Sequence, residues 1–156
     1  MAMTKFKLSD YPLLEDAAYI GIGMLMAIIF YNALGFALNT NDPIVTVVSH
    51  SMLPALNRGD MLFLKGIPFE DLAAGEEHAK GDIIVYICEA ENCPGEKLIV
   101  HRLYKKLDDG KFQTWGDNNP RPDPWIAQKE WISGKVIGRV PLVGYPRLWL
   151  SSAIGR

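Results

Sequence analysis

The side chains best suited to chemistry in this chain are the serines Ser49 and Ser51 and the histidines His50, His78 and His101. A serine hydroxyl becomes an effective nucleophile only when a base accepts its proton and a third group holds that base in the right tautomer. Such a combination transfers acyl groups. A site of this kind therefore needs a histidine within reach of a serine and an acid within reach of that histidine.

The three histidines differ in how well their surroundings suit this role. His50 is next to Ser51, and neighbouring side chains of an extended backbone point to opposite faces, so it is a poor partner. His78 lies in the acidic segment Gly75-Glu76-Glu77-His78, which is typical of a solvated surface. His101 follows the apolar run Leu98-Ile99-Val100 and would be partly buried. On residue types alone, a structural role for His101 is favoured over a catalytic one.

Short β-strands are predicted to position these residues. The segments rich in apolar or β-branched residues are 43–48, 61–65, 83–88, 97–104, 111–115 and 134–140. Glycine-containing turns separate several of them, and 66–80 reads as an exposed excursion. This pattern predicts a mostly β, antiparallel domain. The apolar tail Pro141 to Arg156 either lies on a bilayer surface, with Tyr145 and Trp149 at the headgroups, or packs on the domain.

A membrane anchor precedes this domain. The segment from Ala17 to Leu38 carries no charge and is long enough to cross a hydrocarbon core of about 30 Å as a helix. Glu15 and Asp16 flank its start, and Asn39-Thr40-Asn41-Asp42 follows its end. A cleavable signal peptide would instead have basic residues before it and small residues after it. A retained anchor is therefore favoured over a removed signal peptide or a buried core helix.

The basic residues near the anchor predict its orientation. Lys5 and Lys7 precede it, whereas no basic residue lies between Leu38 and Arg58. Basic residues favour the cytoplasmic side. The predicted organisation is a cytoplasmic N-terminus at 1–16, a transmembrane anchor at 17–38 and an extracytoplasmic β domain at 39–156.

If the β domain is exported, the expected state of Cys88 and Cys93 changes. Outside the cytoplasm such a pair can form a disulfide, and this is favoured over two free buried thiols. No second pair of cysteines or histidines lies nearby to complete four zinc ligands, so no metal is expected.

Composition limits the remaining function classes. With 156 residues, 49% of them hydrophobic, the chain can form one modest domain and one membrane element. A net charge of -2 provides no broad basic surface, which argues against a nucleic-acid partner. No glycine-rich phosphate loop joins a strand to a helix, and no cofactor is expected.

Several short motifs follow one another in a fixed order. They are Ser49-His50-Ser51-Met52-Leu53-Pro54, Arg58-Gly59-Asp60, Gly81-Asp82-Ile83-Ile84-Val85-Tyr86, Ile99-Val100-His101-Arg102, Gly116-Asp117-Asn118-Asn119 and Gly138-Arg139-Val140-Pro141. Together they resemble the type I signal peptidase family, in its archaeal and endoplasmic-reticulum branch. A single Ser-Met-x-Pro would be weak evidence, whereas the ordered set behind one anchor is specific.

This resemblance implies roles for particular residues. Ser51 would be the nucleophile and His101 its general base, at the place where the bacterial branch carries lysine. Asp117 and Asp123 are both candidates for the acid. Asp123 is favoured because the later aspartate usually orients the histidine in this branch, although Arg121 could pair with it and pull it away.

The resemblance also implies an oxyanion site. Its donors would be the backbone N–H of Ser51 and the hydroxyl of Ser49, which lies on the same face of an extended chain. His50 departs from the family pattern, in which glycine is common at this position.

The activity implied is that of a membrane-bound serine endopeptidase that removes signal peptides from exported preproteins. It would cut after small residues of the Ala-x-Ala type, with the substrate added as a strand to a sheet edge. Residues 43–48 and 83–87 would form the pocket walls, unless they are ordinary sheet core. Accessory subunits are further candidate partners, and the compact chain favours an archaeal cell membrane over the endoplasmic reticulum.

Two rival functions remain for comparison. A self-cleaving repressor-type peptidase with a Ser-Lys pair would share the β scaffold, but that class is soluble and would carry lysine instead of His101. A membrane-tethered β module that binds partners without turnover would use the serine motif only structurally.

Overall fold

The structure is a computed structural model that describes residues 12–90, 92–93 and 98–153. The chain divides into two compact units, Met1–Ala37 and Leu38–Arg156. Lys5 and Lys7, on which the predicted orientation depends, lie outside the described residues. The helix of the first unit and the sheet of the second are described in turn.

The helix α1, Pro12–Leu38, has 27 residues and no buried residue, and all of it except Leu38 belongs to the first unit. Proline suits the start of a helix because an N–H there would lack a partner, and Glu15 in the first turn complements the helix dipole. At about 1.5 Å per residue the helix is longer than a hydrocarbon core of about 30 Å. Asn32 donates its Nδ2 hydrogen to the carbonyl oxygen of Ile28 at 2.8 Å, so this polar side chain is satisfied within the helix.

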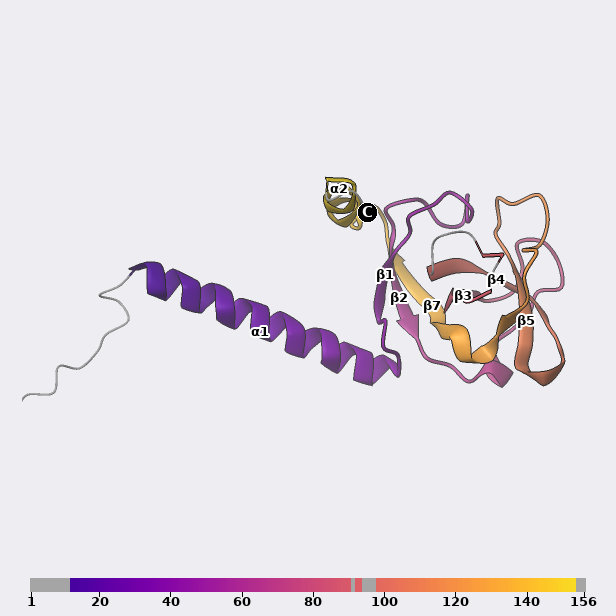
Figure 1. Cartoon of the computed structure of the whole chain (residues 1–156), viewed down its shortest axis with the longest axis horizontal. Coiled ribbons are helices and arrows are strands. Elements are labelled where there is room, and N and C mark those ends of the chain that lie inside the picture. Colours follow the sequence, from indigo (N-terminus) through magenta and orange to yellow (C-terminus); the bar gives the residue numbers. More distant parts are fainter. Residues whose placement is uncertain (1–11, 91, 94–97, 154–156) are drawn as a thin grey trace, which may run out of the picture. The chain divides into compact units, whose positions relative to one another are not determined.

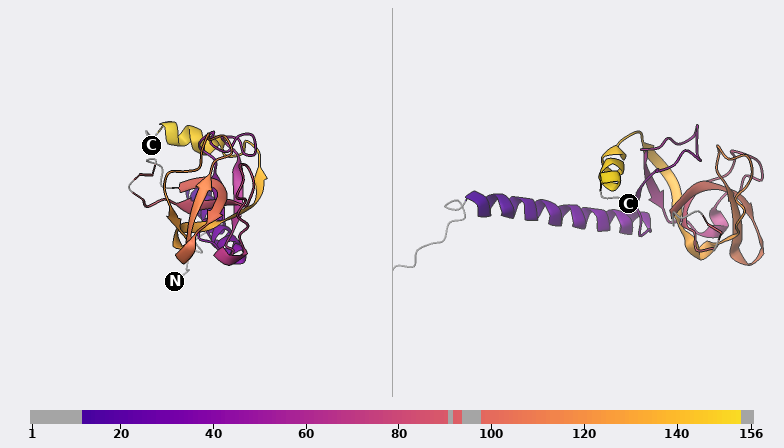
Figure 2. Two further views of the ribbon diagram at one scale, coloured as in Figure 1. Left: turned by 90° about the vertical axis from the view of Figure 1, so that its right-hand side faces the viewer. Right: turned by 45° about the horizontal axis from the view of Figure 1, so that its top comes forward.

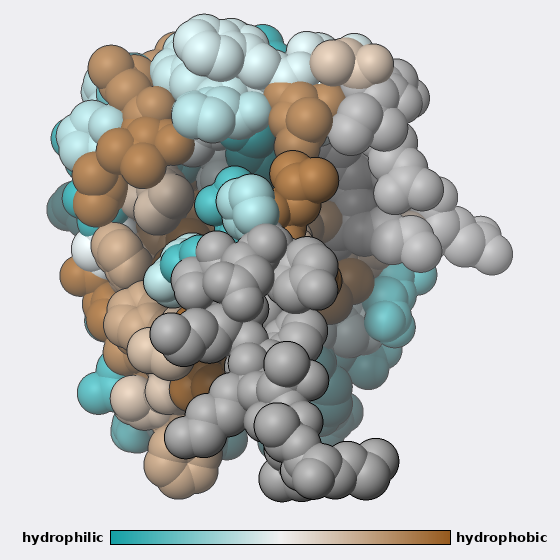
Figure 3. All heavy atoms as spheres, turned by 90° about the vertical axis from the view of Figure 1, so that its left-hand side faces the viewer, coloured by the Kyte–Doolittle hydropathy of each residue, from teal (hydrophilic) through white to brown (hydrophobic). Residues whose placement is uncertain are grey.

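Large apolar side chains of α1 are exposed along its length, among them Ile20, Leu25, Ile29 and Phe36. Figure 3 shows apolar side chains, coloured brown, open to the surface on the face that it presents. A helix that is apolar on all sides and not covered by protein is suited to lipid. The helix is long and apolar enough to cross a membrane. It begins at Pro12 and contains the whole uncharged segment 17–38, whose bounds as the membrane anchor stay a prediction.

The second unit is built on one seven-stranded sheet with the order β1-β2-β7-β3-β4-β5-β6. The strands are β1 Ile44–Thr46, β2 Met61–Lys65, β3 Ile83–Ile87, β4 Leu98–Lys106, β5 Lys111–Trp115, β6 Ala127–Gln128 and β7 Ile132–Val140. All neighbouring strands are antiparallel. Figures 1 and 2 show the sheet curled on itself. The predicted mostly β, antiparallel domain behind one apolar helix is confirmed.

Strand boundaries differ from the prediction mainly at the ends of the sheet. The first strand, predicted over 43–48, is reduced to β1, because Val47 leaves the ladder to bond with the turn at Gly59 and Asp60. The short strand β6 was not predicted, since its two residues pair only with β5. Among the described residues, three single-turn 3₁₀ helices lie in the connections: η2 Phe69–Asp71, η3 Asp108–Gly110 and η4 Lys129–Trp131.

Strand β3 supplies side chains to both hydrophobic clusters of the sheet. Ile84 and Tyr86 belong to one cluster and Val85 to the other, as alternation along a strand requires. In the sheet register Ile84 is opposite His101, and Leu103 is opposite Thr114. The face that carries the first cluster therefore also carries two buried polar side chains.

The C-terminal segment forms α2, Tyr145–Ala153, a helix of the second unit. Leu148 is its buried residue, while Trp149 and Leu150 are exposed. Leu148 thus packs on the domain and the ring of Tyr145 lies against Gly59, whereas a place for Trp149 at the lipid headgroups stays a prediction. Cys88 and Cys93 are joined as a disulfide, with Cα atoms 6.2 Å apart, as the sequence favoured.

Candidate active site

Ser51 and His101 meet although they are far apart in sequence. Ser51 lies on the turn that follows β1, and His101 lies in the middle of β4. Nε2 of His101 is 2.9 Å from Oγ of Ser51. The ring is buried, with 6% of the residue exposed, whereas Ser51 is partly exposed. A base in this position can take the serine proton while the hydroxyl remains open to a substrate.

The other nitrogen of the same ring contacts Asp123. Nδ1 of His101 lies 2.6 Å from Oδ2 of Asp123, which is buried on the loop between β5 and β6. Arg121, a possible competing partner of Asp123, is exposed. The structure therefore brings Ser51, His101 and Asp123 into one hydrogen-bonded row.

Asp117, the second candidate for the acid, is paired elsewhere. Its Oδ1 accepts a hydrogen bond from Nε of Arg102 at 2.7 Å, and its side chain is 2% exposed. Arg102 also donates from Nη1 to the carbonyl oxygen of Gly81 at 2.9 Å. Arg102 thus links Asp117, on the loop after β5, to Gly81 in the turn before β3.

The loop after β5 also holds the backbone at His50 and Ser51, in the turn that carries the nucleophile and is called the serine turn below. The N–H of Asn118 donates to the carbonyl oxygen of Ser51 at 2.8 Å, and its side-chain amide donates to that of His50 at 3.2 Å. Gly116 packs closely against Ser51 and His101. A Cβ at this position would lie 2.8 Å from both Nε2 of His101 and the carbonyl oxygen of Ser51.

Ser49 lies beside the serine hydroxyl of the row. Its Oγ is 3.1 Å from Oγ of Ser51, although the backbone here bends rather than continuing as a strand. His50, between them, is exposed and contributes its carbonyl oxygen to the turn. His78 is exposed as well, and its ring lies 4.5 Å from that of Trp115.

Most residues predicted as pocket walls are core residues instead. Val45 and Val47 pack in one hydrophobic cluster, and Ile84 and Tyr86 pack in the other. For these the alternative of ordinary sheet core holds, because their side chains point inward and both edges of β3 are paired. Val48, just before the serine motif, stays exposed.

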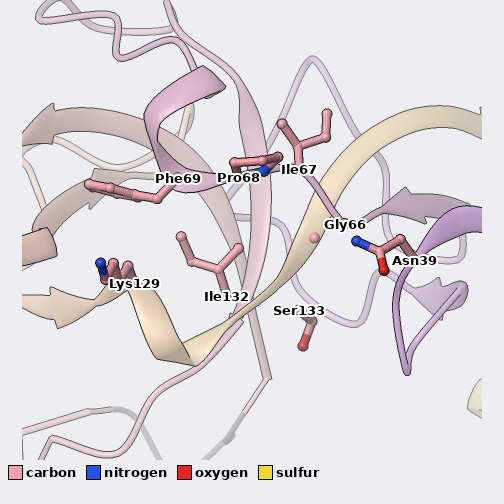
Figure 4. Close-up of a pocket in the computed structure, with 9 residues that line it drawn as sticks. Asn39, Gly66, Ile67, Pro68, Phe69, Lys129, Ile132 and Ser133 are labelled. Carbon is pink, nitrogen blue, oxygen red and sulfur yellow. The ribbon is translucent and has the colours of Figure 1, made fainter.

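A pocket elsewhere in the second unit lies apart from this row. It is lined by apolar and polar residues from three segments: Asn39, Gly66, Ile67, Pro68, Phe69, Lys129, Ile132, Ser133 and Gly134. Figure 4 shows Ile132 and Phe69 beside it, with Lys129 and Asn39 towards opposite sides. None of its residues belongs to the row of Ser51, His101 and Asp123. Among the described residues, no group of three histidine, cysteine or acidic side chains could hold a metal ion.

Sequence reasoning missed the residues that support this row. Thr114 donates to Oδ2 of Asp123 at 2.5 Å, and Asn118 braces the serine turn. Thr114 gave no signal, since it looked like an ordinary strand residue. Arg102 and Asn118 did lie within quoted motifs, but a motif alone does not reveal which backbone atoms its side chains contact.

Comparison with known proteins gives a consistent result over most of the chain. No family model matches it. The chain is 38% identical to the signal peptidase complex catalytic subunit sec11 of Sclerotinia sclerotiorum over 135 residues, covering 80% of this chain and 73% of the relative. It is 34% identical to SEC11 of Zygosaccharomyces rouxii over 137 residues, covering 80% and 75%.

A third relative extends the match further along both chains. This is SEC11 of Metarhizium robertsii, which is 36% identical over 152 residues that cover 90% of this chain and 83% of the relative. All three relatives are fungal, so they give no support to an archaeal origin. Identity at this level over most of both sequences shows that the chain belongs to the family of signal peptidase complex catalytic subunits.

Proposed function

We propose that this chain is a membrane-bound serine endopeptidase that removes signal peptides from preproteins, with Ser51 as nucleophile, His101 as general base and Asp123 as the orienting acid. The observation that carries the proposal is the row itself, with distances of 2.9 Å from Ser51 to His101 and 2.6 Å from His101 to Asp123. The names of the fungal relatives support the class of substrate.

The mechanism follows from the different partners of the two imidazole nitrogens of His101. With Asp123 accepting from Nδ1–H, the lone pair of Nε2 faces the hydroxyl of Ser51. Oγ attacks the scissile carbonyl carbon while its proton moves to Nε2. The same proton then passes to the leaving amine, which departs and leaves an acyl-serine. Water, deprotonated by Nε2, releases the acyl group and restores the serine.

The negative charge that forms on the carbonyl oxygen needs donors in place before the reaction. We assign this role to the backbone N–H of Ser51 and the hydroxyl of Ser49. Ser49 is suited to it because its Oγ lies 3.1 Å from the attacking oxygen, and both hydroxyls lie on the exposed side of the turn. Removal of one such donor typically lowers kcat by about 10²- to 10³-fold.

The substrate would bind in an extended form at the edge of the sheet. β1 is the first strand of the sheet and pairs only with β2 among the described strands, so its outer edge is open. Only Val47 and Val48 separate β1 from Ser49, which brings a strand added there towards Ser51. Small residues before the cut, as in Ala-x-Ala, would fit a site whose neighbouring side chains are already packed in the core.

The same proposal covers the membrane and the partners. We place residues 1–16 in the cytoplasm, the anchor in the endoplasmic-reticulum membrane and residues 39–156 in the lumen. The fungal relatives favour this membrane over the archaeal cell membrane expected from the sequence, and the Cys88–Cys93 disulfide suits an oxidising compartment. Accessory subunits are expected because the relatives are named as parts of a complex. Protease added to sealed microsomes should leave the β domain intact until detergent opens them.

A cleavage assay tests the activity. The full chain in detergent is offered a preprotein with an Ala-x-Ala site, beside Ser51→Ala, His101→Ala and the control Ser152→Ala, which changes an exposed serine of α2. The first two variants should lose at least about 10³-fold in kcat, while the control cleaves like the wild type. Cleavage by Ser51→Ala at the wild-type rate would refute the proposal and favour a noncatalytic binding module.

A further inference from the structure

A chain of three buried hydrogen bonds ends on the carboxylate of Asp123. Nε1 of Trp125 lies 2.8 Å from the hydroxyl of Tyr86, and this hydroxyl lies 2.8 Å from Oγ1 of Thr114. Oγ1 of Thr114 in turn lies 2.5 Å from Oδ2 of Asp123. Tyr86 and Thr114 are at most 1% exposed, so solvent does not compete for these bonds.

Only one assignment of donors and acceptors is possible along this series of hydrogen bonds. An indole nitrogen donates and cannot accept, so the hydroxyl of Tyr86 accepts from Trp125. The carboxylate of Asp123 only accepts, so it takes the single hydrogen of the Thr114 hydroxyl, and the bond between Thr114 and Tyr86 must use the hydrogen of Tyr86. The hydroxyl of Thr114 accepts that bond and gives its own hydrogen to Asp123. The chain delivers a donor to the same oxygen that faces His101.

This arrangement affects the histidine as well as the acid. Oδ2 of Asp123 receives Thr114 Oγ1–H from one side and His101 Nδ1–H from the other. A carboxylate oxygen only accepts hydrogen bonds, so each of these two neighbours supplies the hydrogen of its bond to Oδ2. His101 must then carry its proton on Nδ1, which leaves Nε2 free to accept from Ser51.

The backbone reinforces the same contact. The N–H of Asp123 donates to the carbonyl oxygen of Thr114 at 2.9 Å. The side-chain amide of Gln113, the neighbour of Thr114 on β5, donates to the carbonyl oxygen of Asp123 at 2.8 Å. Thr114 thus holds Asp123 by its main chain and by its side chain, and the loop cannot carry the carboxylate away without breaking both.

We propose that Thr114 is a positioning residue for the reaction, whose hydroxyl, aimed by Tyr86 and Trp125, holds the Asp123 carboxylate towards Nδ1 of His101. This inference rests on the proposed function, since it gives a role to a residue behind the acid. Thr114 is fully covered and touches no surface that a peptide could reach. Its loss should therefore slow the chemical step and leave substrate binding unchanged.

The test compares Thr114→Val, which keeps the shape and removes the hydroxyl, with Thr114→Ser, which keeps the hydroxyl. Preprotein cleavage by the full chain gives kcat and KM, and thermal unfolding gives the melting temperature. Thr114→Val should lose about tenfold in kcat, the scale of one hydrogen bond to a charged group, with KM unchanged. Thr114→Ser should recover most of that loss.

Two further variants guard against a trivial explanation. Thr40→Val removes another threonine hydroxyl that donates, to the carbonyl oxygen of Ser133 at 2.7 Å, away from the row, and it should keep the wild-type kcat. If Thr114→Val does not fold, Tyr86→Phe provides the second measurement. It leaves the hydroxyl of Thr114 in place but removes the hydrogen bond that orients it, so kcat should fall by about threefold with KM unchanged.

The outcomes separate this inference from the proposed function. If Asp123→Asn abolishes cleavage but Thr114→Val and Tyr86→Phe cleave like the wild type, the positioning role is overturned and the proposed function stands. A rise in KM with unchanged kcat also overturns it, because that would be a binding effect. If Asp123→Asn itself cleaves like the wild type, Asp123 is not the acid. The acid named in the proposed function and the positioning role of Thr114 are then both wrong.

Discussion

Nδ1 of His101 lies 2.6 Å from Oδ2 of Asp123, and both side chains are buried. The next residue on β4, Arg102, is paired with the other acid of this region, Asp117. Consecutive residues of a strand point to opposite faces. His101 and Arg102 therefore point away from each other, and each pairs with a different acid. The two acids should consequently have different effects on activity and on stability.

Replacement of the two acids by asparagine should separate these effects. Asp123→Asn offers His101 an amide that cannot hold the required tautomer, so kcat should fall by about 10⁴-fold. Asp117→Asn weakens a buried pair with Arg102 and should lower the free energy of unfolding by about 1 to 3 kcal/mol. Preprotein cleavage and thermal unfolding of both variants provide the comparison.

The opposite pattern would show that the acids have been assigned the wrong way round. That pattern is an inactive Asp117→Asn that melts like the wild type, beside an active Asp123→Asn. Asp82→Asn is a suitable control, because its carboxylate pairs with Lys135 in a third place.

A methyl group at Gly116 should disable the site by displacement alone. The Cβ of Gly116→Ala would lie 2.8 Å from Nε2 of His101 and from the carbonyl oxygen of Ser51, closer than Cβ contacts allow. A shift of about 1 Å between reacting groups can cost about 10²-fold in rate. Cleavage kinetics should show such a loss in kcat. Gly138→Ala, whose Cβ would meet only Phe63 at 3.9 Å, should keep wild-type activity, and equal rates for both variants would contradict the explanation.

The fold was predictable where side-chain patterns repeat along the chain. Alternating apolar residues and glycine turns identified β2 and β5 with the correct bounds. The ends of the sheet were less predictable, since β1 and β6 are short and depend on a single neighbouring strand each. The helix α2 was not predicted as a helix, because Pro146 in its first turn looks like a breaker even though proline is tolerated there.

The site was predictable only as far as motif resemblance reaches. Residue types alone favoured a structural role for His101, and only the order of the motifs pointed to a base. Nothing in the sequence shows that Thr114 lies behind Asp123, because that contact depends on a loop that folds back onto β5. Long-range contacts of this kind follow from register and loop path, which local patterns do not encode.

Asn118 should matter for rate because it holds the backbone of the nucleophile. Its side chain donates to the carbonyl oxygen of His50 at 3.2 Å, next to the backbone bond with Ser51. Asn118→Ala removes the first bond and keeps the second, so kcat should fall by about threefold to tenfold, the scale of one neutral hydrogen bond. Asn41→Ala, at an exposed position before β1, is the matched control in the same assay. A wild-type kcat for Asn118→Ala would mean that the serine turn holds its shape without this side chain.

Tyr86 should make the domain less stable at alkaline pH. Burial raises the pKa of its phenol; the hydrogen bonds with Thr114 and Trp125 lower it in part, and the charge of Asp123 raises it. Above pH 10 or so, the ordinary pKa of tyrosine, the unfolded chain loses this proton while the folded chain keeps it. The unfolded state then binds fewer protons, so the free energy of unfolding falls with rising pH, by up to about 1.4 kcal/mol per pH unit. Tyr86→Phe lacks this contribution. Urea unfolding of the full chain in detergent between about pH 9 and pH 11 should show the wild type losing its advantage over the variant as pH rises, and parallel curves would disprove the effect.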